Sequence, residues 1–510
     1  MSKKIVICCD GTGNEFGQKN SNVVKLYQSL RSGVDQATYY HPGVGTMGAK
    51  NALTQAGKVL TKIRGLAFGY GLSENIADAY QFLMRTFEPD DQVFIFGFSR
   101  GAYTARALCG MLQMFGLLSA GNEGLVPYAI RLFKSNDQAK FRIAAGFKQT
   151  FCTECKPHFL GLFDTVSSVG WVLDPIGLKP GRLPYTRRLD EVAIIRHAVS
   201  IDERRAFFRQ NLVEEKPGRD IKQVWFAGVH SDVGGSYPEA ESGLSKISLR
   251  WMLREAESAG LLLNDATARK ILGANPNYAK PLANAIQHNS LTAAWWLGEI
   301  WPKWTKKRVS LPGVEPEKFT GAPRLNLFRR RFTSNGICIH QSVIERRQLV
   351  PTYTPSNLPE DYTVEPEPEQ TPYPVQLNPG RKLVVGIHAR AKWNDTTIQL
   401  CKGEKYLLEV QERQRWREQW HDSSIPSGPE GYKSPSIWFR LVQRLRRKPD
   451  ADWFALIGAI GQDESTAFII GRRAVLEVKK DGILYCFAND LPFKYGNNSG
   501  VIRLTVTRLA

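Results

Sequence analysis

A five-residue turn between a strand and a helix constrains this chain more than any other feature. The pentapeptide Gly-Phe-Ser-Arg-Gly at 97–101 follows the apolar run 93–96 and precedes the helical pattern of residues 102–112. In that context a G-x-S-x-G turn presents its serine at the tip of a strand. The N-terminus of the following helix favours a developing negative charge. We therefore predict that Ser99 is a catalytic nucleophile.

The rest of residues 1–350 alternates between strand-like and helix-like segments. Strand-like runs occur at 5–9, 38–40, 93–97, 158–166 and 223–229. We interpret residues 196–205, which include His197, as a charged helix. Strands separated by helices predict a mostly parallel, doubly wound sheet with ligands at its carboxyl edge. Together with the serine turn, this pattern predicts an α/β-hydrolase domain over residues 1–350.

The chain changes character after residue 350. Residues 351–383 are rich in proline and acidic side chains and have no helical period, which predicts a semi-extended linker. Residues 384–510 contain short strand-like runs bounded by glycine and asparagine turns. This pattern predicts an all-β sandwich domain.

A serine nucleophile needs a base and a carboxylate that orients the base. Asp164 and Asp232 each lie near the tip of a strand-like run, and the candidate bases are His230 and His340. Hydrolases of this fold usually carry the acid after the second strand beyond the nucleophile and the histidine after the third. Counting strands in this way favours Ser99–Asp232–His340. The set Ser99–Asp164–His230 remains the alternative.

Backbone N–H groups must also face the oxyanion of the reaction. A glycine-rich turn at 10–14 follows the first strand, and we expect Gly11 or Thr12 to donate one N–H group. Arg100, directly after the nucleophile, would donate the other. A nucleotide phosphate loop is disfavoured at this turn because no G-x-G-x-x-G pattern is present and no Lys-Ser/Thr follows.

Net charge and hydropathy limit the kinds of partner that the chain can have. The formal net charge of +19 favours an anionic partner, but it is spread along the chain. No apolar run is long enough to span a membrane, and the N-terminus does not resemble a secretory signal. Tryptophans beside a basic run predict a membrane-interface lid, with a core helix as the alternative. These tryptophans are Trp295, Trp296, Trp301 and Trp304.

Several motifs resemble those of a known family. They read CDGTGN at 9–14, GFSRGA at 97–102, FDTV at 163–166, HAVSIDERR at 197–205, GVHSDVGG at 228–235 and IHQSV at 339–343. In order and spacing they resemble an uncharacterised α/β-hydrolase family whose known bacterial members are type VI secretion lipase effectors. The resemblance implies a phospholipid substrate and a secretion-machinery or immunity-protein partner, with no nucleic acid. It also implies synthesis in the cytoplasm without a signal peptide, followed by secretion to the periplasm of a target cell.

A polar loop near the end of the chain suits a calcium ion. Its oxygen-bearing side chains include Asp490, Asn497 and Asn498, although an ordinary hairpin turn is the alternative. Residues 384–510 resemble the PA-I galactophilic lectin family. That resemblance implies Ca²⁺ binding by these three side chains and by the backbone carbonyl of Lys494. The family's sugar-contacting His and Gln have no match here.

These observations favour a serine esterase of the phospholipase A type that acts as an antibacterial effector. A second hypothesis is a hydrolase of a soluble or carbohydrate ester, brought to its substrate by the lectin-like module. A third is a carbohydrate-binding protein without enzymatic activity, which the intact serine turn argues against.

Overall fold

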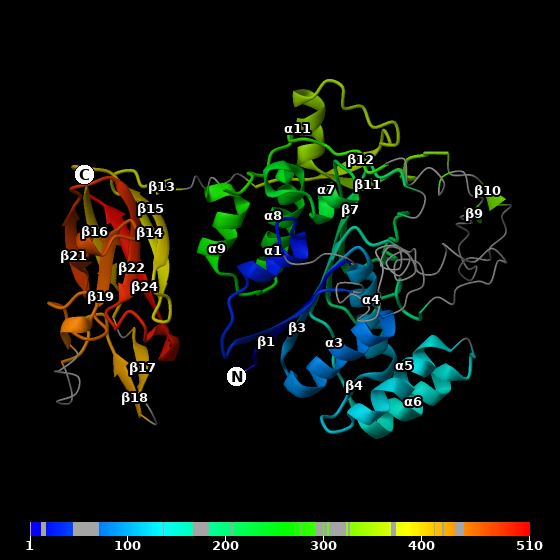
Figure 1. The fold of residues 1–510 in the computed structure, drawn as a ribbon, viewed down its shortest axis with the longest axis horizontal. Coiled ribbons are helices and arrows are strands. Elements are labelled where there is room, and N and C mark those ends of the chain that lie inside the picture. Colours follow the sequence, from blue (N-terminus) through cyan, green and yellow to red (C-terminus); the bar gives the residue numbers. More distant parts are fainter. Residues whose placement is uncertain are drawn as a thin grey trace, which may run out of the picture. The chain divides into compact units, whose positions relative to one another are not determined.

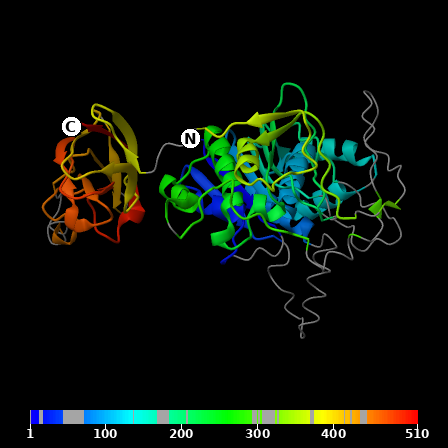
Figure 2. The same ribbon diagram turned by 90° about the horizontal axis from the view of Figure 1, so that it is seen from above.

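A computed structural model gives the fold of the chain. The described residues, which are coloured in Figure 1 and seen from above in Figure 2, follow as ranges. They are 2–11, 17–43, 71–135, 137–166, 183–205, 208–275, 277–291, 299, 303–304, 323–324, 327–368, 374–412, 414–420, 423–433 and 443–509. The chain divides into two compact units, Met1–Glu367 and Pro368–Ala510.

The first unit is built on an eight-stranded sheet in the order β12-β11-β8-β7-β6-β3-β1-β2. Every strand pair described in this sheet is parallel. The strands are β1 (Lys4–Cys9), β2 (Gln36–His41), β3 (Gln92–Phe98), β6 (Phe159–Phe163), β7 (Ile194–Ser200), β8 (Asp220–Phe226), β11 (Ile337–His340) and β12 (Tyr362–Glu365). Parallel pairing places the carboxyl ends of all these strands at one edge, where ligands bind in open α/β sheets.

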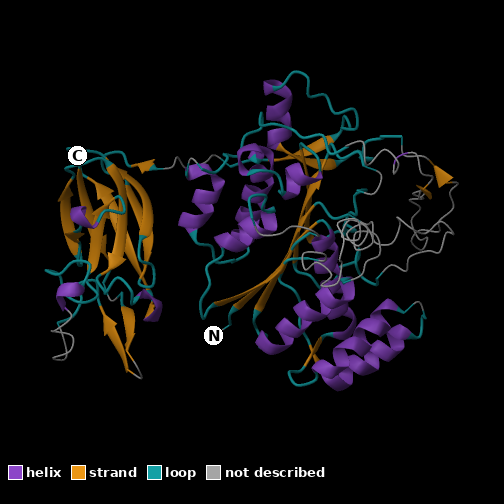
Figure 3. Ribbon diagram, viewed as in Figure 1, coloured by secondary structure: helices purple, strands orange, loops and turns teal. Residues whose placement is uncertain are grey.

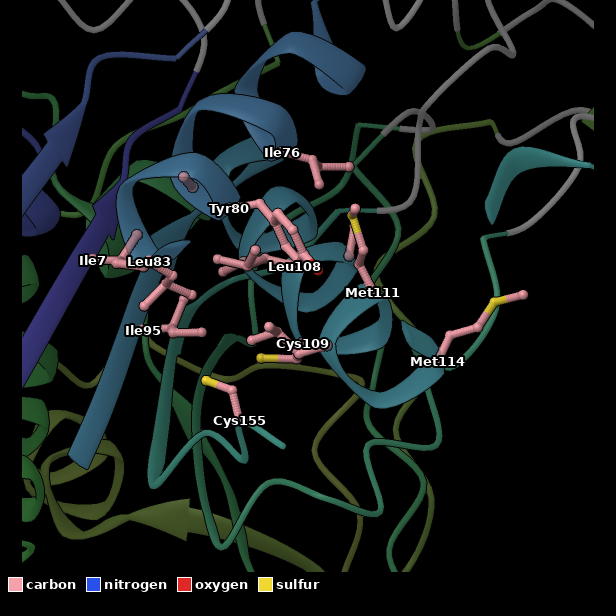
Figure 4. Packing of buried hydrophobic residues seen from close by; sticks show 14 of the residues in the cluster. Ile7, Ile76, Tyr80, Leu83, Ile95, Leu108, Cys109, Met111, Met114 and Cys155 are labelled. Carbon is pink, nitrogen blue, oxygen red and sulfur yellow. The ribbon is translucent and has the colours of Figure 1, made fainter. Parts of the chain in front are cut away.

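Helices cover both faces of this sheet. They are α1 (Asn22–Ser29), α3 (Leu72–Thr86), α4 (Arg100–Phe115), α5 (Val126–Lys134), α6 (Lys140–Phe151), α7 (His230–Gly234), α8 (Gly243–Ser258), α9 (Asp265–Arg269) and α11 (Gln341–Leu349). Ile7 of β1 lies in one core with Leu83 of α3 and Leu108 of α4 (Figure 4). The neighbouring Val6 lies in a second core with α1 and α8. This alternation follows from the two-residue period of a strand buried on both faces.

The remaining elements of the first unit are short. They are the two-residue strands β4 (Leu117–Leu118), β5 (Cys152–Thr153), β9 (Lys303–Trp304) and β10 (Pro323–Arg324), and the single turns η1 (Glu123–Leu125), η2 (Glu239–Glu241) and η3 (Lys270–Ala274). Within the described ranges, no helix combines the length and the apolar character needed to cross a bilayer.

The second unit is built from β-sheets, as Figure 3 shows. One sheet has the order β13-β15-β22-β19-β20 and another β14-β24-β16-β21, with β18-β17-β23 beside them. The two larger sheets contribute side chains to one shared core, as expected of a sandwich. The strands are β13 (Val375–Gln376), β14 (Lys382–His388), β15 (Asn394–Leu400), β16 (Lys405–Val410), β17 (Trp416–Trp420), β18 (Ser423–Ser427), β19 (Leu456–Ile460), β20 (Phe468–Ile469), β21 (Arg473–Glu477), β22 (Gly482–Ala488), β23 (Asn498–Ser499) and β24 (Val501–Arg508), with turns η4 (Gln443–Leu445), η5 (Glu464–Thr466) and η6 (Tyr495–Asn497).

Two segments differ from the sequence interpretation. Residues 351–383 do not form a continuous linker, because β12 pairs with β11 in the large sheet and β13 pairs with β15 in the second unit. The segment around His197 is the strand β7 and not a charged helix. Its charged side chain Arg196 is buried because ion pairs with Asp220 at 2.6 Å and Glu255 at 2.5 Å neutralise it.

Candidate active site

Ser99 occupies a backbone conformation that few side chains adopt. Its φ is 58° and its ψ is −117°, between the end of β3 and the start of α4. The Ser99 N–H donates to the carbonyl of Phe163 at 3.1 Å, and the Ser99 carbonyl accepts from the Tyr103 N–H at 3.3 Å. Strain of this kind persists only where neighbouring structure enforces it. The conformation agrees with the sharp strand-to-helix turn predicted from the sequence.

The two glycines of the motif are required by close backbone approach. A Cβ atom on Gly97 would lie 2.5 Å from the carbonyl oxygen of Gly101. A Cβ atom on Gly101 would lie 2.5 Å from the carbonyl oxygen of Asp10 and would also overlap that of Cys9. Such distances are shorter than any ordinary carbon–oxygen contact, so both positions exclude a side chain. The turn and the end of β1 therefore pack backbone against backbone.

A histidine from the end of the sheet reaches the serine. His230 is the first residue of α7, which follows β8, and its Nε2 lies 2.8 Å from Ser99 Oγ. Its Nδ1 lies 2.5 Å from Oδ2 of Asp164, the residue after β6. With a proton on Nδ1, the ring donates to Asp164 and accepts from the Ser99 hydroxyl. This is the order of contacts that a serine nucleophile requires.

Asp164 is held by a buried arginine that the sequence analysis missed. Arg331 donates to both carboxylate oxygens, at 2.5 Å and 2.9 Å, and the Ser200 N–H adds a third bond at 2.9 Å. Burial alone would raise the pKa of Asp164, but Arg331 and His230 together lower it below its usual value. Burial lowers the pKa of His230, and Asp164 only partly opposes this effect. At neutral pH the aspartate is therefore ionised and the imidazole is neutral.

The His230 ring is fixed from several sides. Phe98 stacks on it with ring centroids 4.8 Å apart, and Phe208 meets it edge-on at 4.9 Å. The His230 N–H donates to Glu203 at 3.2 Å, and Glu203 also pairs with Arg205 at 2.9 Å. Burial would raise the pKa of Glu203, but the bond to Arg205 lowers it to about 2. The base therefore has little freedom to rotate away from Ser99.

The structure does not bring the favoured acid and base to Ser99, and this corrects the sequence prediction. Asp232 bonds to His288 at 2.7 Å. His340 caps α11, and its Nε2 lies 3.1 Å from Oε2 of Glu367. The counting failed because β7 was taken for a helix. With β7 counted, His230 follows the third strand after the nucleophile, where the rule places the histidine, but Asp164 follows the first strand and not the second, where the rule places the acid.

The candidate oxyanion donors are only partly described. The Gly11 N–H donates to the side chain of its neighbour Asp10 at 2.6 Å. Thr12 lies outside the described residues. Arg100 begins α4, so its N–H has no acceptor within the helix. Burial lowers the pKa of its side chain to about 10.

The tryptophan segment is largely undescribed. Trp295, Trp296 and Trp301 lie outside the described residues, and Trp304 belongs to β9.

The loop predicted to bind calcium lies in the second unit. The Asp490 carboxylate is buried and accepts from the Asn498 amide at 3.0 Å and from the Leu491 N–H at 2.6 Å. Burial raises the pKa of Asp490. The Asn498 Oδ1 is buried and has no hydrogen-bond partner among the described residues. Carboxylate and amide oxygens of this kind are suitable ligands for a hard cation. Asn497 and Lys494, the other predicted ligands, belong to the turn between Asp490 and Asn498.

Residues 3–255 match the family model of the T6SS (type VI secretion system) phospholipase effector Tle1-like catalytic domain. This part of the chain belongs to that family. An uncharacterized protein of Saccharomyces cerevisiae is 40% identical over 226 residues, which are 41% of this chain and 32% of the yeast protein. The chain thus spans about a third of that relative's length.

Three solved structures show weaker similarity. An uncharacterized protein from Pseudomonas aeruginosa is 22% identical, covering 55% of this chain and 49% of that one, with a TM-score of 0.32. The Tle1 effector bound to the VgrG spike of the type 6 secretion system is 21% identical, covering 48% and 52%, with a TM-score of 0.26. The N-terminal domain of EclA, a PllA-like lectin, is 17% identical, covering 24% and 94%, with a TM-score of 0.19.

Proposed function

We propose that the first unit is a serine hydrolase of the α/β-hydrolase fold, with Ser99 as nucleophile. The observation that carries the proposal is the chain of contacts from Ser99 through His230 to Asp164, at 2.8 Å and 2.5 Å. His230 takes the proton from the Ser99 hydroxyl as the oxygen attacks an ester carbonyl. Asp164, already ionised, stabilises the imidazolium that forms. The same imidazolium then returns its proton to the leaving alcohol.

Family membership supports a phospholipid as the substrate. Residues 3–255 belong to a phospholipase effector family. The net charge of +19 favours an anionic lipid surface. We therefore propose cleavage of an acyl ester of membrane glycerophospholipids, of the phospholipase A type. As an effector, the protein would be exported by a type VI machinery to a target-cell periplasm, and an immunity protein in the producing cell would block it.

Liposome hydrolysis tests this proposal. The full chain should release fatty acid and lysophospholipid from phosphatidylglycerol or phosphatidylethanolamine vesicles, and Ser99→Ala should not. A fluorophosphonate probe should label the wild-type chain at Ser99 only. If the probe labels the chain and the chain cleaves a soluble ester but leaves the vesicles intact, the second hypothesis of a soluble or carbohydrate ester substrate is favoured. Absence of labelling would reject the serine mechanism.

For the second unit we propose one Ca²⁺ site. The side chains of Asp490, Asn497 and Asn498 and the carbonyl of Lys494 would hold the ion. Support comes from the buried carboxylate of Asp490 and from the Asn498 oxygen that lacks a hydrogen-bond partner among the described residues. A bound cation would offset the cost of burying these oxygens. The unit would then offer a carbohydrate-binding surface that directs the hydrolase to a cell envelope.

A further inference from the structure

A second cluster of a histidine and carboxylates lies beside the candidate triad. His288 donates from Nδ1 to Oδ1 of Asp232 at 2.7 Å, and its backbone N–H donates to Oδ2 at 3.1 Å. On the other side of the ring, Nε2 lies 3.0 Å from Oε2 of Glu241. The Tyr237 ring stacks on the imidazole with centroids 3.5 Å apart. His288 therefore bridges two carboxylates that belong to different elements.

Asp232 connects this cluster to the catalytic base. It lies in α7, two residues after His230, and its Oδ2 accepts the N–H of Val229 at 3.0 Å. Gly228 leaves room for this arrangement, because a Cβ atom there would lie 3.0 Å from Asp232 Oδ2 and closer still to its Cβ. The Asp232 side chain thus fixes the turn from which His230 projects.

The segment that carries His288 makes a second attachment to the same helix. The Ser290 hydroxyl donates to the two carboxylate oxygens of Glu203 at 3.0 Å and 3.1 Å. Glu203 in turn accepts the backbone N–H of His230. Arg346 holds the earlier part of the segment through the carbonyls of Ala283 and Ala285, at 2.6 Å and 2.7 Å. The segment therefore fastens both carboxylates that hold the start of α7.

The charges around His288 favour its protonated form. The groups that face its ring are Asp232 from α7, Glu241 from η2 and the phenol of Tyr237. Glu203 and Arg205 act on that phenol from the segment after β7. The bond to Asp232 raises the pKa of His288, burial opposes this rise, and Glu241 adds to it. The ring can donate from both nitrogens only as an imidazolium.

We propose that His288 is a positioning residue for the hydrolase. As an imidazolium it clamps Asp232 and Glu241 and so keeps α7 in the position that aligns His230 with Ser99. This inference rests on the proposed hydrolase function. It assigns a role to Asp232, which bonds to His288 although the sequence favoured it as the catalytic acid.

The clamp gives the activity an alkaline limit. His230 acts as a base only when neutral, so activity rises with pH through its lowered pKa. His288 clamps only when protonated, so activity falls as pH rises through its raised pKa. We therefore expect a bell-shaped profile of kcat/KM on a soluble ester. Its acid limb belongs to His230 and its alkaline limb to His288.

Three variants separate positioning from a purely structural role. Glu241→Gln removes one carboxylate, so the alkaline limb should move to lower pH while the plateau stays within about twofold of wild type. His288→Asn keeps a neutral donor at the Nδ1 position and should abolish the alkaline limb. His288→Phe keeps the stack on Tyr237 but loses both bonds, and should lower kcat about tenfold with KM nearly unchanged. Melting curves confirm that each variant folds.

Glu367→Gln is the matched control, because it makes the same carboxylate-to-amide change beside another histidine, His340. Its profile should match that of wild type. Wild-type profiles from both Glu241→Gln and His288→Asn would overturn the positioning role. Labelling of wild type by a fluorophosphonate, absent from Ser99→Ala, shows separately whether the hydrolase proposal holds. If wild type is not labelled, the hydrolase proposal fails and the role of His288 falls with it.

Discussion

Asp164 and Asp232 are both buried and both bond to the Nδ1 of a histidine, at 2.5 Å and 2.7 Å, yet the pKa values of the two histidines are shifted in opposite directions. Burial lowers the pKa of His230, although Asp164 opposes this effect, and Asp164 itself also pairs with Arg331. The bond to Asp232 raises the pKa of His288, the burial of this partly exposed ring opposes the rise, and the second carboxylate, Glu241, adds to it. The comparison teaches that burial and the other charged neighbours decide in which direction the pKa of a histidine paired with an aspartate is shifted.

Replacing the two aspartates separately is the strongest test of this difference. Asp164→Asn should reduce kcat roughly a thousandfold or more, because the amide cannot stabilise the imidazolium. Asp232→Asn should reduce kcat about tenfold, because it loosens α7 but leaves the contacts between Ser99, His230 and Asp164 in place. Steady-state hydrolysis of a soluble ester measures both. Losses of equal size, or a reversed order, would return Asp232 to the role of catalytic acid.

Replacing Arg331 should make the Asp164–His230 pair resemble the Asp232–His288 pair. In Arg331→Met the carboxylate of Asp164 loses its balancing charge and attracts the His230 proton more strongly. The pKa of His230 then rises, so the acid limb of kcat/KM should move to higher pH, with roughly a hundredfold loss of kcat below the new limb. An unmoved acid limb in a folded variant would show that Arg331 does not set the charge of the pair.

Acid unfolding sharpens the comparison through Glu203, which holds the backbone of His230. Its pKa is lowered to about 2 in the folded chain, against burial, by the bond to Arg205. A carboxylate whose pKa is lowered on folding stabilises the folded chain at pH values above the ordinary pKa of a glutamate. This stabilisation is lost as pH falls from about 4.5 towards 2. Glu203→Gln should remove about 3 kcal/mol of that pH-dependent stability. Urea unfolding at pH 7 and pH 2 measures it, with Glu88→Gln at the surface as control.

The replacement of Asp490 has the smallest expected effect. Asp490 is a third kind of buried aspartate, because its carboxylate accepts a hydrogen bond from the Asn498 side-chain amide. If Ca²⁺ binds there, millimolar CaCl₂ should raise the melting temperature of the second unit in the full chain. At a hundred times the Kd the stabilisation is about 2.7 kcal/mol. Asp490→Ala should abolish the shift and leave hydrolysis of a soluble ester unchanged. Calorimetry that detects no calcium-dependent shift in wild type would leave the loop as a hairpin turn.

The local patterns in the sequence were informative, and the long-range ones were not. The turn around Ser99 could be predicted because its glycines, its strand and its helix are adjacent in the chain. Arg331 could not, because it lies 167 residues from Asp164 and only the fold brings the two together. Neither it nor His288 belongs to a motif that points to a site.

The error in strand counting also has a physical cause. Charged residues are uncommon inside a buried sheet, so Arg196 beside His197 was interpreted as part of a charged helix. In the sheet, Arg196 is buried because Asp220 and Glu255 neutralise it, while His197 lies 3.2 Å from the Gln223 side chain. A pattern of hydrophobic periodicity does not identify a strand that buries charged side chains. Missing that one strand moved the predicted histidine from His230 to His340.

The long separation between Asp164 and Arg331 has a consequence for synthesis. A ribosome adds roughly 5–20 residues per second, so His230 emerges roughly 5–20 seconds before Arg331 does. During that interval Asp164 lacks the Arg331 guanidinium, and the last two strands in the chain order of this sheet, β11 and β12, have yet to join it. Until Arg331 emerges, the nascent chain therefore holds Ser99, His230 and Asp164 without the cation that pairs with the aspartate in the folded chain. For the proposed hydrolase, this order of synthesis would delay activity until the part of the chain that holds Arg331 has emerged.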